Sequence, residues 1–126
     1  MNIEEWAKKT EQNIDTARNR LAFHIYASVV KKTPVDTGRA RGNWHISKGS
    51  PEPQILERDD KNGRILPEEI EKINSAKAEE TIYIQNNLPY INALEYGHSK
   101  QAPQGMVRLT MANVEHYINE AVRETK

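Results

Sequence analysis

The sequence predicts one α+β domain, in which a long N-terminal helix and a C-terminal helix pack on a small antiparallel β-sheet. Three observations predict it. Apolar residues recur with the period of a helix near both ends of the chain, they alternate with the period of a strand at two places in between, and the chain has 126 residues. That length is typical of a single domain, because two shorter pieces would each bury too little surface. We therefore expect residues 1–126 to form one unit.

The first predicted element is a helix over Ile3–Lys32. This stretch contains neither Pro nor Gly, and its apolar residues recur at steps of three and four. Because Pro34 disfavours helical geometry in the residue before it, we expect the helix to end by Thr33. The apolar stripe consists of Ile3, Ala7, Ile14, Ala17, Leu21, Ile25 and Val29.

Residues 34–38 then read as a turn. Pro34 fixes φ, Asp36 can bond to the backbone that follows it, and Gly38 is free to adopt a positive φ. A strand is predicted next, over Arg39–Ser47, because its residues alternate. The face expected to pack consists of Ala40, Gly42, Trp44 and Ile46, and the face expected to be polar and basic consists of Arg39, Arg41, Asn43, His45 and Ser47.

A loop over about 48–66 follows, and it is long for a compact domain. Its two prolines, its charge cluster and its few apolar residues favour a segment that is flexible in the isolated protein and becomes ordered against a neighbour. Pro67 suits the first position of a short helix, which we expect to run to about Ala78. A second strand is predicted over Thr81–Asn86, which is β-branched and aromatic.

The rest of the chain is predicted to be helical in two places. Residues 90–96 form one or two helical turns that end at Gly97, a candidate left-handed cap. From Gly105 to the C-terminus the apolar residues again follow the helix period, so we expect a terminal amphipathic helix.

The composition excludes several functional classes. The chain has 18 basic and 18 acidic residues, so it lacks the basic excess typical of general nucleic-acid binders, and without cysteine it has no thiolate ligand or nucleophile. The four histidines are not spaced as metal ligands, and no glycine-rich phosphate loop occurs. We expect no enzyme, cofactor or metal site. No apolar run approaches the ~20 residues that span a bilayer, so we expect no membrane partner.

Two properties favour an assembly. The mean hydropathy of −0.84 and the aromatic content of 6% are low for a self-sufficient globule, so part of the fold is expected to depend on partner subunits. The best candidate anion-binding group is Arg39, Arg41 and His45 on the polar strand face. These side chains would contact the backbone of DNA or pair with acidic groups of a neighbouring subunit, and the neutral net charge favours the second.

Three segments in order resemble one known family. They are Thr33-Pro34-Val35-Asp36-Thr37-Gly38-Arg39 leading to Trp44, then Tyr83 to Asn87 followed by Tyr90 and Glu95-Tyr96-Gly97, then Ala102-Pro103-Gln104-Gly105-Met106-Val107. The pattern is similar to that of the tail-component, or tail-completion, family of long-tailed bacteriophages, proteins of the neck and head–tail junction. Residues 48–78 depart from it.

The resemblance implies a small α+β subunit that works as a ring of identical copies, six being one candidate number, without catalytic residues. It implies a place in the virion tail or neck after assembly in the host cytoplasm. The implied partners are other copies, the neighbouring tail-tube, tail-terminator or head–tail connector proteins, and genomic DNA in passing. The motif residues expected to shape the backbone are Pro34, Asp36, Thr37, Gly38, Trp44, Tyr96, Gly97, Pro103 and Gly105.

Two other classes stay open. One is a cytosolic adaptor, or a different morphogenesis factor, that binds its partner as a monomer. The other is a small nucleic-acid-binding protein or nuclease that uses Arg39, Arg41 and His45. Light scattering separates the first from a ring, and salt-dependent binding of DNA exposes the second.

Overall fold

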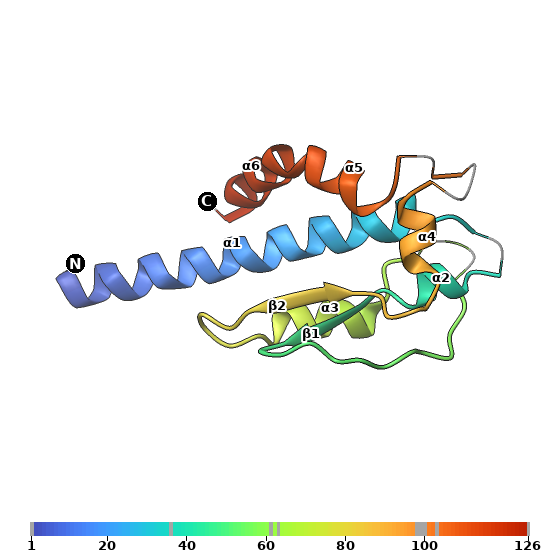
Figure 1. Ribbon diagram of the computed structural model, residues 1–126. Coiled ribbons are helices and arrows are strands. Elements are labelled where there is room, and N and C mark those ends of the chain that lie inside the picture. The colour runs from blue at the N-terminus through green and yellow to red at the C-terminus, as the bar shows by residue number, and fades with distance from the viewer. Residues whose placement is uncertain are drawn as a thin grey trace.

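The computed structural model describes residues 2–35, 37–60, 62, 64–97, 101–102 and 104–125 and confirms the α+β class. Its central element is the long helix α1 (Ile3–Lys32). A two-stranded sheet and helix α3 (Pro67–Asn74) lie on one side of α1, and helices α5 (Val107–Ala112) and α6 (Val114–Thr125) lie along the other (Figure 1). The C-terminal helices thus pack on α1, which separates them from the sheet.

Helix α1 has the predicted bounds, and local chemistry explains both ends. The Asn2 side chain accepts a hydrogen bond of 2.8 Å from the Glu5 amide, which satisfies one of the unpaired amides of the first turn. Lys31 and Lys32 lie in the last turn, where the helix dipole favours cations, and Thr33 is extended, as a residue before proline should be. Among the described helices, none is long and apolar enough to cross a membrane.

The sheet consists of β1 (His45–Lys48) and β2 (Ile82–Gln85), paired antiparallel with His45 opposite Gln85 and Lys48 opposite Ile82. The second strand lies within the predicted range 81–86, and the antiparallel pairing is confirmed.

The first strand was predicted to be longer than it is. Residues 39–42 form a short helix, α2 (Arg39–Gly42), in place of the first half of the strand. Gly38 has a φ of 88°, which only glycine adopts readily, and its carbonyl accepts the Gly42 amide at 2.9 Å. The helical turn brings the Gly42 backbone against the Arg58 carbonyl, where a Cβ atom would clash. The predicted strand over Arg39–Ser47 is therefore wrong for its first four residues. The polar and basic face predicted for this stretch is wrong for the same reason.

We call residues 49–60, which have neither helix nor strand, the strap. This long segment without regular structure agrees with the predicted loop. Polar contacts hold it to the rest of the fold. The Leu56 amide donates to the Asn43 side chain at 2.7 Å, and the side chains of Gln85 and Asn87 each donate to the Glu52 carbonyl at 2.7 Å. The predicted flexibility stays a prediction, and these contacts argue for order at positions 52 and 56.

The later helices differ in detail from those predicted. Helix α3 ends at Asn74, four residues before the predicted end. Helix α4 (Ile91–Glu95) is followed by Gly97 with a φ of 87°, as a left-handed cap requires. The predicted single C-terminal helix is two helices, because the backbone leaves helical geometry at Asn113. The change of direction lets α6 follow α1 (Figure 1).

The core lies between α1, the sheet and α3. Trp44 is only 4% exposed, which confirms its predicted burial, although it lies just before β1 and not within it. The other members of the core cluster are Ala22, Tyr26, Val29, Val30, Ile46, Ile73, Ala102 and Met106.

Candidate functional site

The motif segments, distant in sequence, meet at the C-terminal end of α1. The backbone amide and carbonyl of Val35 form two hydrogen bonds with the Gln101 side chain, of 2.9 and 3.0 Å. Thr33 accepts a hydrogen bond of 2.7 Å from the Trp44 indole, and Arg41 donates to the Thr33 carbonyl at 2.9 Å. The first motif segment is thus tied to the core, and to Gln101, which directly precedes the last segment.

Glu95 connects the second and third motif segments. Its carboxylate accepts the backbone amides of Met106, Val107 and Arg108 at 2.8–3.0 Å, and the Arg108 guanidinium at 3.1 Å. These amides open α5, so Glu95 caps that helix from another element. Partial burial alone would raise the pKa of Glu95, but these hydrogen bonds hold it below its usual range. Gly105 has a φ of 86° and lies against Glu95, where a side chain would clash.

We call the contacts of Thr33, Val35, Glu95, Gln101 and residues 105–108 the clasp. Thr37 belongs to the turn beside it and accepts the Arg39 amide at 3.2 Å. Tyr96 is 68% exposed, and the Arg108 guanidinium lies 5.0 Å from the centre of its ring. The predicted motif residues Asp36 and Pro103 lie outside the described residues.

Two open cavities flank the clasp. Both include Pro34 and Gln101 in their walls, and both are shallow enough to be surface features. One, of about 230 Å³, has three cationic side chains in its wall, those of Lys31, Lys32 and Arg41. The other, of about 430 Å³, is lined by residues of the predicted turn, including Thr37, Gly38 and Arg39, and by Tyr90 and Leu94 of the second segment.

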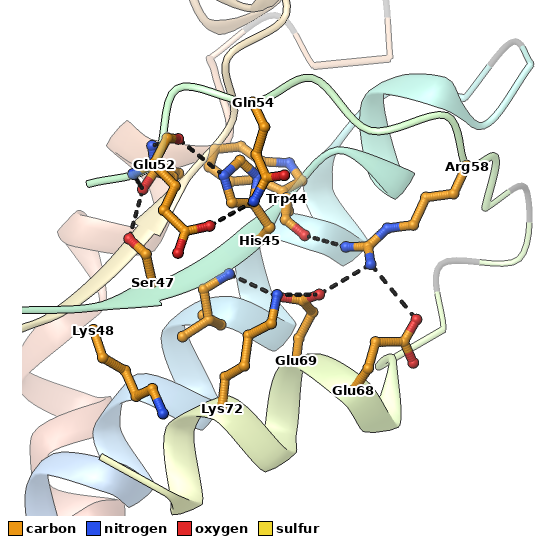
Figure 2. Close-up of polar contacts among 12 residues, drawn as sticks. Trp44, His45, Ser47, Lys48, Glu52, Gln54, Arg58, Glu68, Glu69 and Lys72 are labelled. Atoms are coloured by element: carbon orange, nitrogen blue, oxygen red, sulfur yellow. Dashed lines mark hydrogen bonds and ion pairs between the residues drawn. The ribbon is translucent and has the colours of Figure 1, made fainter. Parts of the chain in front are cut away.

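A second polar cluster lies under the strap, around a buried glutamate (Figure 2). Glu69 has no exposed surface and accepts hydrogen bonds from the Ile46 amide at 2.7 Å, from Arg58 at 2.9 Å and from Lys72 at 3.1 Å. Burial would raise the pKa of Glu69, but these donors lower it. Arg58 also donates to the Trp44 carbonyl at 2.9 Å. Glu69 is thus a fixed anion that ties α3 to the free edge of β1, and it lacks the raised pKa of a general acid.

The structure does not assemble the predicted anion-binding face. Arg39 is exposed on α2, Arg41 binds backbone carbonyls at the end of α1, and His45 is fully buried beneath the strap. The His45 ring nitrogens lie 3.0 Å from the Asn43 carbonyl and 3.3 Å from the Glu52 carbonyl. The predicted face is wrong because residues 39–42 are helical. Arg39 and Arg41 therefore do not share a strand face with His45.

Sequence reasoning missed Glu95, Glu69 and Arg58 as key residues. Glu95 stands inside a motif segment, but its partners follow 11 to 13 positions later. Glu69 reads as one acid on a charged helix, and Arg58 as one charge in a loop. Their pairing across 11 positions has no local signal. Within the described part of the chain, no group of three or more His, Cys, Asp or Glu could hold a metal ion.

Large apolar side chains are exposed in two groups on helices, besides Ile55, Tyr90 and Tyr96. On α1 they are near the N-terminus, where Ile3 is 84% exposed, Trp6 61% and Ile14 63%. On α5 and α6 they form two pairs, each four residues apart. That second set is Val107, Met111, Ile118 and Val122.

Comparisons with protein-family models, with curated proteins and with solved structures find no match to this chain.

Proposed function

We propose that this chain is a structural virion protein of a tailed bacteriophage, a tail-completion or neck subunit that acts as a ring of identical copies. Its task is to complete the tail or to join it to the head. The partners in this proposal are other copies and the adjoining tail-tube, tail-terminator or head–tail connector proteins.

The observation that carries the proposal is the clasp. Three motif segments that resemble the tail-completion family are distant in the sequence and lie near one another at one end of the molecule: Glu95 of the second bonds to the third, and Gln101, which precedes the third, bonds to the first. Each segment alone is ordinary turn or cap chemistry. Their proximity supports the view that they form one structural signature, because Glu95 of the second segment accepts the amides of the third, and Gln101, next to the third, bonds to the first.

Exposed apolar side chains on α5 and α6 support assembly. They form two pairs, each spaced by about one helical turn, and exposed apolar side chains grouped on a polar protein are typical of an interface. In a ring the contact is heterologous, so this surface would pack against a different surface of the next copy.

The proposal also includes a passing contact with DNA. We place it at a cavity beside the clasp instead of on the predicted strand face. The cavity beside the clasp brings together Lys31, Lys32 and Arg41 from two elements, whereas His45 is buried and cannot take part. This grouping also favours the second candidate function, a small nucleic-acid-binding protein. The two differ in salt dependence, because a dedicated binder loses affinity steeply as salt rises.

The test is genetic and structural together. In the virus that encodes the chain, its loss should leave heads and tails that look nearly complete but do not form stable infectious particles. The double variant Lys31→Glu with Lys32→Glu should leave assembled particles intact and impair genome passage or retention. Normal particles without the chain would overturn the proposal, as would tight, salt-sensitive DNA binding or sustained hydrolytic turnover by the purified protein.

A further inference from the structure

Helices α5 and α6 are separated by one residue, Asn113. Its backbone amide donates to the Thr110 carbonyl at 3.1 Å, three positions back, whereas a continuous α-helix would direct this amide to the carbonyl four positions back. That carbonyl belongs to Leu109, and it accepts a hydrogen bond of 3.0 Å from the Asn113 side chain. The side chain thus takes the place of the backbone amide and stabilises the break.

The sequence on both sides of Asn113 nevertheless suits one continuous helix. Residues 107–125 contain neither Pro nor Gly, and their apolar residues recur in steps of four and three. The apolar stripe is Val107, Met111, Val114, Ile118 and Ala121, with Val122 beside it.

The break divides this stripe. In a straight helix each residue turns by about 100°, so the four members that are exposed in the structure would lie on one side, within about 60° of one another. They are Val107, Met111, Ile118 and Val122. In the structure they remain two separate pairs, one on each helix. A strong local pattern that the structure interrupts is typical of a functional or strained site.

Few apolar contacts hold α6 on α1. Ala121 is the one fully buried residue of α6, and no residue of α6 belongs to the core cluster of the described chain. Specific polar contacts define its position. The Glu124 carboxylate lies 2.6 Å from the His24 imidazole, and the Tyr117 hydroxyl donates to Ser28 at 3.1 Å. These pairs identify the surface of α1 that fits α6, whether α6 belongs to the same chain or to another copy.

We propose that α6 exchanges between copies of this chain. In the exchanged form α5 and α6 are one straight helix, and α6 docks on α1 of a second copy, where it makes the same contacts with His24 and Ser28. The exchange therefore keeps the contacts between α1 and α6 and gains an unbroken helix. Exchange of an identical element is a low-cost route to association.

The structure selects the occupant of this surface, because α6 is the element that packs on it within one chain. The exchange joins two copies whether it is reciprocal or passes from one copy to the next. It therefore does not depend on the proposed function, and a protein without a ring would still show it.

Cysteine cross-linking tests the exchange, because the natural chain has no cysteine. Differently tagged His24→Cys and Glu124→Cys variants are expressed in the same cells and treated with a short bis-maleimide. We expect cross-linked dimers with one copy of each variant, since the two cysteines meet only when α6 of one copy lies on α1 of the other. His24→Cys expressed with Glu71→Cys, an exposed site on α3, measures random collisions. A yield no higher than in that control would overturn the proposal.

Two substitutions at one position test the hinge in the same assay. Asn113→Ala removes the bond to Leu109 and favours a helix, so the yield of cross-linked dimers should rise roughly fivefold, the effect of about one hydrogen bond. Asn113→Gly removes the same bond but disfavours a helix, so the yield should stay well below that of Asn113→Ala. Equal yields in the two variants would contradict exchange through a straight helix.

Discussion

Trp44 and Trp6 lie in opposite environments of one chain. Trp44 is 4% exposed, and its indole donates to Thr33 inside the core, whereas Trp6 is 61% exposed on α1. The same amino acid therefore supports folding at one position and leaves a surface free for contact at the other. Burial and not residue type decides its role.

The two residues give a matched stability test. Trp44→Ala should lower the free energy of unfolding by about 3–5 kcal/mol, since it leaves a cavity and removes the hydrogen bond that the Thr33 hydroxyl accepts. Trp6→Ala should change it by no more than about 0.5 kcal/mol. Both values come from denaturant unfolding at low protein concentration. Equal effects would mean that Trp44 does not anchor the sheet to α1.

Glu95 gives a test of the clasp that depends on pH. Its pKa is lowered in the folded protein, so its stabilising effect is complete well above the unfolded value of about 4.3 and is lost as the pH falls through the folded pKa. Glu95→Gln should cost about 1–2 kcal/mol at neutral pH, as the loss of a helix cap does. It should also make the stability less sensitive to acid.

The measurement is the free energy of unfolding between pH 3 and 7 for the wild type, Glu95→Gln and the exposed control Glu71→Gln. Glu69 has a lowered pKa as well, so some acid sensitivity should remain in Glu95→Gln. If Glu95→Gln and the wild type lose stability in parallel as the pH falls, the carboxylate does not cap α5 in solution.

At the scale of elements, the strap shows how a segment without helix or strand is held. Its contacts are polar and come from β2, from the end of α2 and from Arg58 within the strap itself. Asn43 is central because it is fully buried and makes hydrogen bonds to both the amide and the carbonyl of Leu56. Few apolar groups reinforce these bonds.

Asn43→Ala should therefore release the middle of the strap. We expect faster hydrogen exchange at the Leu56 amide and a loss of about 1–3 kcal/mol, because buried partners lose their hydrogen bonds. Exchange measured by nuclear magnetic resonance checks this, with the exposed Asn74→Ala as the control. A Leu56 amide that already exchanges freely in the wild type would show that the strap is flexible, as the sequence alone predicted.

The elements differ in how far the sequence could predict them. The bounds of α1 were predictable because they depend on local signals: the helix period is sustained over 30 residues, and Pro34 ends it. The short α2 was not, since four residues of apparent alternation fit a strand equally well and the close approach of Gly42 to Arg58 decides between them. The clasp was visible as three motifs, but its central contact, made by Glu95, joins residues that local patterns do not relate.

In the whole molecule, α1 lies between two layers and packs against both. The sheet and α3 cover one side, α5 and α6 cover the other, and the N-terminal end of α1 extends past both (Figure 1). The described chain presents exposed apolar side chains at the N-terminal end of α1 and on α5 and α6, and a cavity with cationic residues beside the clasp. Several distinct surfaces are what a subunit needs if it contacts neighbours on more than one side.

The measurement that tests the central claim most directly is the mass of the purified, full-length chain in solution, by native mass spectrometry and light scattering over a range of concentrations. We predict a closed assembly of one defined copy number, which electron microscopy would show as a ring with a central opening. A chain that stays monomeric at every concentration, and also in the presence of tail tubes, would contradict the assignment as a ring subunit.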